Sequence, residues 1–96
     1  MKHFKQLPSN PLNGGIQYKT KFENGYGASI VQHSFSYGGS NKWELAVLSN
    51  ISEDLTRFSL DYSTSVTNDV LGYLSEEEVM ETLQKIKDLP DFVKIN

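Results

Sequence analysis

The sequence contains no cysteine, and its only histidines are His3 and His33. A structural zinc site generally takes four ligands from Cys and His, a supply that this chain does not have. A secreted domain of this size usually needs disulfides, so the lack of cysteine favours a reducing compartment, the cytoplasm. We therefore expect no bound metal and no other cofactor.

Long hydrophobic runs are also lacking. No stretch approaches the roughly 20 apolar residues that span a bilayer, which argues against a membrane partner. The segment Met1–Pro8 lacks the apolar core of a signal peptide. The 96 residues, 38% hydrophobic and 22% charged, have the length and composition of one globular domain. We predict an N-terminal arm over residues 1–14 and a single α+β domain over residues 15–96.

Basic residues are outnumbered, and the formal net charge is −3. Residues 1–22 hold four lysines and no acid, whereas residues 23–96 hold five basic and twelve acidic residues. A generic nucleic-acid-binding protein would be basic overall, so the charge disfavours that class. Lys19 and Lys21 either form a basic patch or decorate the solvent face of a strand.

Residues 16–22 alternate strictly between two faces. The less polar face carries Ile16, Tyr18, Thr20 and Phe22. The other face carries Gln17, Lys19 and Lys21. This alternation predicts a half-buried strand. Before it, Pro8, Pro11 and the Asn-Gly-Gly run at 13–15 break any regular element, which is why an arm is predicted there.

The dipeptide Asn24-Gly25 predicts a two-residue type I′ hairpin turn, because both residues tolerate φ > 0. A second strand then runs over about 26–37. In this register Phe22 opposes Gly27, so the ring can lie across the bare glycine backbone. Both faces of the second strand carry apolar side chains, which indicates a central place in the sheet.

Two further strands follow the turn at Gly38-Gly39-Ser40-Asn41. Residues 43–48 are a nearly continuous apolar run and predict a buried strand, and residues 57–62 alternate and predict a fourth. No helix-length segment separates these strands, so we predict a four-stranded antiparallel β-meander. Residues 67–72 are consistent with a single capped helical turn that Gly72 ends.

The C-terminal helix is the best-specified element. Ser75 and Glu78 have the spacing of a capping box, and three glutamates in the first turn complement the helix dipole. An apolar stripe is formed by Val79, Met80, Leu83 and Ile86. Because Pro90 disfavours helix just before it, the helix is expected to span 75–88 and to pack on one face of the sheet.

Residues suited to catalysis are sparse. His33 and Glu44 face one another across the second hairpin in one register, as an acid–base pair would, and a cross-strand polar pair without chemistry is the alternative. The glycines at 25–27 and 38–39 neither open a helix nor precede a Gly-Lys-Ser/Thr motif, so turns explain them. We therefore predict no catalytic residue and no enzyme.

A surface patch is the remaining candidate for function. Aromatic rings and glycines gather around the two predicted turns: Tyr26, Tyr37, Gly38, Gly39 and Trp43. Such rings can anchor a protein partner or stack on a base. Together with Lys19 and Lys21 they make the predicted binding site. The alternative, in which Trp43 and Tyr26 are core rings, stays open.

Several segments resemble small uncharacterised accessory proteins encoded by bacteriophages and prophages. The resemblance covers roughly residues 14–89 and is carried by residues 23–31, 36–38, 43–48 and 66–79. Its motifs are a hairpin turn, a Trp strand and a capped helix, which are structural. The resemblance implies work in a host bacterial cytoplasm and an accessory role, and by analogy a host-directed or anti-defence inhibitor.

We therefore expect a non-enzymatic phage accessory protein that binds a host or phage protein. The alternative is a nucleotide or single-stranded nucleic-acid binding module that uses Tyr and Trp rings with Lys19 and Lys21. The overall acidity favours the first. Whether the chain forms homo-oligomers is left open.

Overall fold

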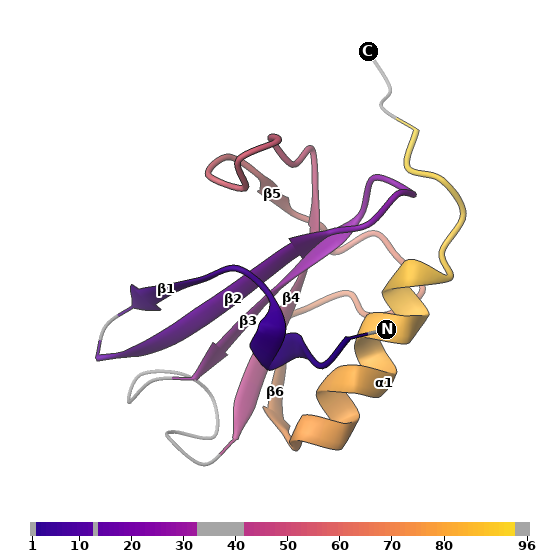
Figure 1. The fold of residues 1–96 in the computed structure, drawn as a ribbon. Coiled ribbons are helices and arrows are strands. Elements are labelled where there is room, and N and C mark those ends of the chain that lie inside the picture. Colours follow the sequence, from indigo (N-terminus) through magenta and orange to yellow (C-terminus); the bar gives the residue numbers. More distant parts are fainter. Residues whose placement is uncertain (1, 13, 33–41, 94–96) are drawn as a thin grey trace.

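The computed structural model describes residues 2–12, 14–32 and 42–93. Along the chain these residues form a short 3-10 helix η1 (Phe4–Gln6), strands β1 (Ser9–Leu12), β2 (Gly15–Lys21), β3 (Gly27–Gln32), β4 (Trp43–Ser49), β5 (Ser59–Leu60) and β6 (Leu71–Leu74), and helix α1 (Glu76–Lys87). All strand pairs are antiparallel, and α1 packs on one face of the sheet (Figure 1). This confirms the predicted α+β class with a C-terminal helix.

The strands follow one another across the sheet in the order β1-β2-β3-β4-β5, and β6 also pairs with β4. The central place predicted for the second strand is confirmed, since β3 lies between β2 and β4. The fourth predicted strand, 57–62, is reduced to the two residues of β5. The helical turn predicted over 67–72 is wrong, because the chain re-enters the sheet as β6 at Leu71. β5 and β6 thus share one side of β4 as two short pieces of an edge.

The β2–β3 hairpin has a three-residue loop, so the predicted register is wrong by one residue. Gly25 N–H donates to Phe22 O at 3.0 Å, and Phe22 N–H donates to Tyr26 O at 2.7 Å. Lys21 therefore pairs with Gly27, where Phe22 was expected. A type I′ turn needs positive φ at both central residues, and in this loop only Gly25 adopts it, at 89°.

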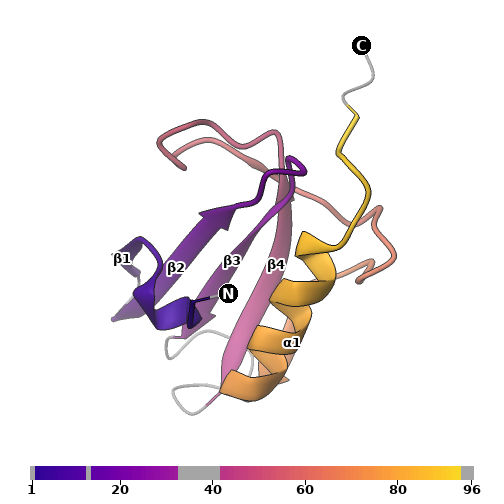
Figure 2. The ribbon, with the colours of Figure 1, turned by 45° about the vertical axis from the view of Figure 1, so that its right-hand side comes forward.

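This register places the core on one face of the sheet. Tyr18 pairs with Ile30, which in turn pairs with Leu45, so these three side chains share a face. Helix α1 lies against that face of the sheet (Figure 2). Its buried apolar side chains belong to the same core cluster: Val79, Leu83 and Ile86. The buried stripe confirms the apolar pattern predicted for the helix.

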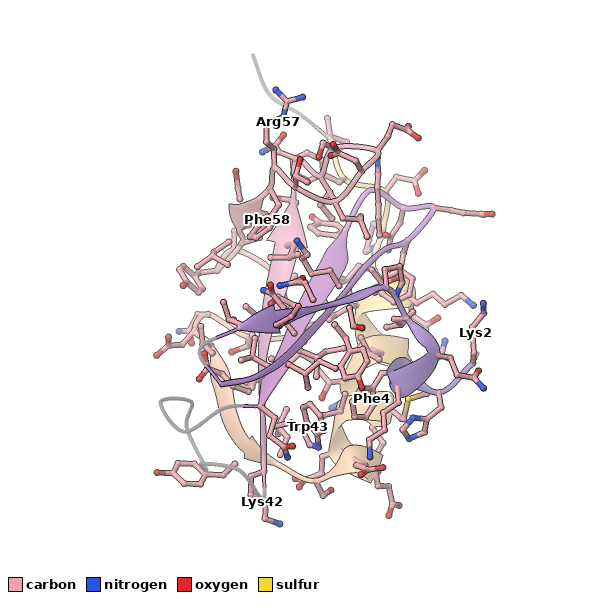
Figure 3. All side chains as sticks on the ribbon, turned by 60° about the vertical axis from the view of Figure 1, so that its left-hand side comes forward. Lys2, Phe4, Lys42, Trp43, Arg57 and Phe58 are labelled. Carbon is pink, nitrogen blue, oxygen red and sulfur yellow. The ribbon has the colours of Figure 1, made fainter. Side chains whose placement is uncertain are left out.

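The segment expected to be an unstructured arm carries η1 and β1, so proline and glycine there do not prevent regular structure. Phe4 is fully buried and lies beside Trp43 (Figure 3). Its ring centroid is 4.9 Å from that of Trp43 and 5.6 Å from that of Tyr18, and both ring pairs are nearly perpendicular. Next to it, Lys5 Nζ lies 2.7 Å from Glu76 Oε2. The N-terminal segment therefore closes the core and is tied to the start of α1.

The edge strand β1 tolerates its one proline, Pro11, because of where that residue lies. Lys19 N–H donates to Pro8 O. In an antiparallel pair every second residue directs its backbone N–H and C=O at the partner strand, so in β1 Asn10 directs these groups at β2. The backbone nitrogen of Pro11 points away from β2, so its missing N–H removes no hydrogen bond between the two strands. A strand added at this edge would find no N–H at Pro11, so β1 blocks further pairing there.

Both ends of α1 are capped. Ser75 Oγ accepts from Glu78 N–H and the Glu78 carboxylate accepts from Ser75 N–H, which confirms the capping box. At the other end the buried Asn24 reaches over from the β2–β3 loop. Its Nδ2 donates to the carbonyls of Ile86, Lys87 and Leu89 at 2.9, 3.2 and 3.1 Å. Ile86 O also accepts from Leu89 N–H at 3.2 Å, so the Asn24 amide adds a second closure to this helix end from the hairpin loop.

Candidate functional site

The residues predicted to form an aromatic patch are not brought together within the described part of the chain. Tyr37, Gly38 and Gly39 lie outside the described residues, so that turn stays a prediction. The ring of Trp43 is 4% exposed and belongs to the core. Tyr26 is half-buried, with its ring edge-to-face against Phe92 at 5.4 Å between centroids. The core alternative for Trp43 is the one that the structure shows.

The two predicted lysines hold a loop in place. They project from β2 on the face opposite α1, where Lys19 Nζ donates to Leu55 O at 2.8 Å and Lys21 Nζ donates to Ile51 O at 3.1 Å. The ammonium of Lys19 also lies 5.4 Å from the centroid of the Phe58 ring. Both cations therefore fix the β4–β5 loop onto the sheet.

Gly27 is needed for the same contact between loop and sheet. A Cβ atom at this position would lie 2.0 Å from Thr20 O and 2.6 Å from Ile51 Cδ1. The predicted reason for a glycine, a Phe22 ring lying across it, is wrong. Because Gly27 has no side chain, β2 and the β4–β5 loop can both lie close to its backbone.

The β4–β5 loop is organised by its own polar side chains. Asp54 Oδ1 accepts from the hydroxyls of Thr56 and Ser52, both at 2.7 Å. These bonds, with one from the Thr56 backbone N–H, lower the pKa of Asp54 to about 2. The Ser52 hydroxyl in turn accepts from Arg57 N–H at 3.0 Å. The loop is thus a compact, hydrogen-bonded unit that carries Arg57 on its outer side (Figure 3).

A hollow of about 440 Å³ opens between the β2–β3 turn, this loop and the C-terminal segment. We call it the turn hollow, and it is lined by Lys21, Gly25, Asn50, Ile51, Ser52, Arg57 and Phe92. Phe92 is fixed there because its N–H donates to Asn24 O at 2.6 Å. The lining therefore combines two cations, two uncharged polar side chains and two large apolar side chains. A hollow of this size is in the range of small-molecule and side-chain sites.

The edge made by β5 and β6 exposes large side chains. Leu60 is 48%, Tyr62 44% and Tyr73 69% exposed. We call these three residues the β5–β6 edge patch. All three are far more exposed than the large side chains of the core, and they lie on or next to the two short strands that pair with β4.

The conformation of Tyr73 is unusual. Trp43 pairs with Leu74 and Leu45 pairs with Leu71, so Gly72 and Tyr73 together oppose one residue of β4 and form a β-bulge. Tyr73 has φ 59°, a left-handed conformation that costs roughly 1–3 kcal/mol for a bulky residue. The glycine of the bulge does not take this conformation. The bulge re-aims an exposed aromatic ring at the cost of strain.

A buried carboxylate ends β5. Burial alone would raise the pKa of Asp61, but hydrogen bonds from the Ser63 hydroxyl and N–H and from the Ser49 side chain outweigh it and lower that pKa. The Asp61 N–H still donates to Val47 O at 2.8 Å. The side chain then turns the chain away from the sheet, which explains why the predicted 57–62 strand stops early.

The described part of the chain does not bring side chains together as a metal site or an acid–base site would require. Within residues 2–12, 14–32 and 42–93, no three His, Asp or Glu side chains gather closely enough to hold a metal ion. His3 Nε2 lies 3.5 Å from Glu76 Oε1 on the surface. His33 lies outside the described residues, and Glu44 pairs with Val31, so the register in which Glu44 opposes His33 is wrong.

Sequence reasoning missed the turn hollow. Arg57 is the one arginine of the sequence and follows a polar run, which was a signal for an exposed cation. Phe92 gave no signal, because only the tertiary contact with Asn24 brings it beside Gly25.

The chain matches no protein-family model, no curated protein and no solved structure. Among the described residues, no helix has the length and apolar content that crossing a membrane requires.

Proposed function

We propose that this chain is a non-enzymatic accessory protein of phage origin that acts in the host bacterial cytoplasm by docking on a host or phage protein. The phage origin and the compartment rest on the resemblance described above and on the lack of cysteine. Inhibition of a host defence system is the form of this role that the analogy suggests.

The observation that carries the proposal is Tyr73 of the β5–β6 edge patch, which exposes its ring and holds its backbone in the left-handed conformation. Tyrosine is enriched among residues that dominate protein–protein binding. Leu60 and Tyr62, at the β5 end of the same sheet edge, add exposed contact area. Backbone strain of this kind persists only where the surroundings fix it, and it clusters at functional sites. Tyr73, with Leu60 and Tyr62, therefore supports docking through this edge.

The nucleic-acid alternative is less well supported. Lys19 and Lys21, its expected phosphate contacts, donate to loop carbonyls on the sheet. The net charge of −3 also opposes a polyanion. Protein docking therefore remains the leading proposal.

Affinity capture from infected host cells tests the proposal. We expect a protein retained by the wild-type chain and by Lys85→Ala, a control on the exposed face of α1, but lost with Tyr73→Ala. Once purified, that partner should bind Tyr73→Ala about 2 kcal/mol more weakly, the loss typical of an interface anchor. Tyr37→Ala, measured alongside, tests the patch predicted from sequence.

Two results would contradict the proposal. One is equal retention of every captured protein by Tyr73→Ala and by the wild type, with both variants folded. The other is capture of nucleic acid in place of protein, abolished by nuclease treatment.

A further inference from the structure

The turn hollow differs from its neighbours in the sign of its charge. Its ionisable lining residues are Lys21 and Arg57, with no acidic side chain among them. The adjacent hollow of about 530 Å³ shares Lys21 but is also lined by Glu23, Lys87 and Asp91, so its charges are mixed. Of these two hollows, the turn hollow is the one whose ionisable lining residues are all cationic, so it is the better suited to an anion.

Hydrogen-bond donors are available in the turn hollow. Within the described residues, the side chains of Arg57 and Asn50 have no hydrogen-bond or ion-pair partner. Lys21 uses its ammonium for Ile51 O and has further N–H groups to donate. A guanidinium binds a carboxylate through two parallel hydrogen bonds, which are stronger than neutral ones. The polar part of a ligand would therefore be an anion held by Arg57 and Lys21.

Two residues that line the turn hollow have large apolar side chains. Ile51 is 7% exposed, and Phe92 lies so close to Gly25 that a Cβ atom added to this glycine would be 3.0 Å from the Cβ of Phe92. A ligand that fits both parts has a carboxylate next to a large apolar group. An acidic residue beside a hydrophobic residue on a protein surface has this chemistry.

We propose that the turn hollow binds an acidic side chain of the partner protein, with a neighbouring apolar side chain of that partner on Ile51 and Phe92. This inference rests on the proposed docking function and names the chemistry of the partner. A phosphate site is less suitable, because the glycine amide that would cradle phosphate is already bonded: Gly25 N–H donates to Phe22 O. The chain then contacts its partner at two places, the β5–β6 edge patch and the turn hollow.

A titration of the isotope-labelled full chain tests the hollow without any partner. Phenylacetate supplies the carboxylate and the apolar group, and phenylacetamide is its neutral match. We expect phenylacetate to shift the backbone amide signals of Gly25, Ser52, Arg57 and Phe92 at millimolar concentration, and phenylacetamide to leave them in place. Added salt should weaken the binding.

Variants identify the group responsible. Arg57→Gln should lower the affinity for phenylacetate about tenfold or more, the loss expected for a hydrogen bond to a charged group. Arg57→Lys should retain part of it, and Lys85→Gln, on the exposed face of α1, should bind as the wild type does. Because Arg57 is exposed and makes no side-chain bond within the described residues, these variants should keep the wild-type melting curve.

Three outcomes would overturn the assignment: no shift with phenylacetate, equal shifts with phenylacetamide, or stronger shifts of the same amides with adenosine monophosphate. The first two leave no carboxylate site, and the third shows a nucleotide site. None of them depends on the capture of a partner, so failure here is distinct from failure of the docking proposal.

Discussion

Asn24 shows how much one polar side chain can carry in a small domain. Asn24 is 9% exposed. Its side-chain oxygen Oδ1 accepts from Tyr26 N–H, and its side-chain nitrogen Nδ2 donates to carbonyls at the end of α1. Its backbone carbonyl accepts from Phe92 N–H. One residue therefore fixes the hairpin loop, the helix end and the C-terminal segment relative to one another.

Substitution of Asn24 should be costly for stability. Asn24→Ala takes the amide donor away from the carbonyls of Lys87 and Leu89, and a buried group left unsatisfied costs about 1–3 kcal/mol. We expect the free energy of unfolding to fall by about 2–3 kcal/mol, measured by urea denaturation. Asn24→Asp matches the size but cannot donate when ionised, and its charge faces the negative end of the helix dipole. If Asn24→Asp were as stable as the wild type, the amide donor would not matter.

Tyr73 offers a test of strain at a single residue. Tyr73→Ala removes the ring and keeps a Cβ in the left-handed conformation, whereas Tyr73→Gly removes both. We expect the glycine variant to be more stable than the alanine variant by about 1 kcal/mol, because glycine adopts positive φ without penalty. Binding to the captured partner should fall equally in both. Equal melting temperatures of the two variants would mean that the position carries no strain.

Among the elements, the N-terminal segment is the one whose importance is hidden in the sequence. Phe4→Ala should lower the free energy of unfolding by about 3–5 kcal/mol, because it empties a site enclosed by Tyr18 and Trp43. For a domain of this size that is a fall in melting temperature of roughly 12 °C or more. Gln6→Ala, an exposed position in the same helical turn, is the control. A melting curve unchanged by Phe4→Ala would restore the predicted arm.

Elements with local signals were predictable, and those set by distant contacts were not. The capping box of α1 and the strand β4 each depend on residues close together in the sequence, and both were predicted correctly. The hairpin register failed because Asn24 takes a conformation that serves the helix 62 residues away. β1 was missed because proline is compatible with the outer side of an edge strand, which sequence alone does not locate.

The candidate site shows the same division. Exposed lysines on β2 could be predicted from alternation, but not that Lys19 and Lys21 would bond to loop carbonyls. The turn hollow depends on three segments that only the fold brings together: the β2–β3 turn, the β4–β5 loop and the stretch around Phe92.

For the whole molecule, acid should be destabilising. The pKa of Glu78 is lowered by hydrogen bonds from the backbone and hydroxyl of Ser75, that of Glu76 by Lys5, and those of Asp54 and Asp61 by hydroxyl groups. A carboxyl group with a lowered folded-state pKa stabilises the fold above its unfolded pKa, and that stabilisation is lost as pH falls through the folded value. The melting temperature should therefore be level between about pH 5 and 7 and fall between about pH 4 and 2.

Glu78→Gln provides the control for this pH dependence. Glutamine can still accept the Ser75 N–H bond but does not titrate, so the variant should lose less stability in acid than the wild type does. A melting temperature that stays level down to about pH 2 would contradict the assignment of these carboxylates.

The loop residue that clamps the helix is also chemically vulnerable, because Asn24 is followed by glycine. In an Asn-Gly pair the glycine nitrogen can attack the side-chain amide, which releases ammonia and forms a succinimide that hydrolyses to aspartate or isoaspartate. In the fold the Gly25 N–H is bonded to Phe22 O and the Asn24 amide is bonded to the helix carbonyls, so both reacting groups are held apart from this path. Conversion should therefore follow local opening of the loop.

Peptide mass mapping after long incubation should show this conversion of Asn24 to be faster in Phe4→Ala than in the wild type. Each converted molecule loses its helix clamp and cannot regain it by refolding, so the stability of this contact sets the chemical lifetime of the protein.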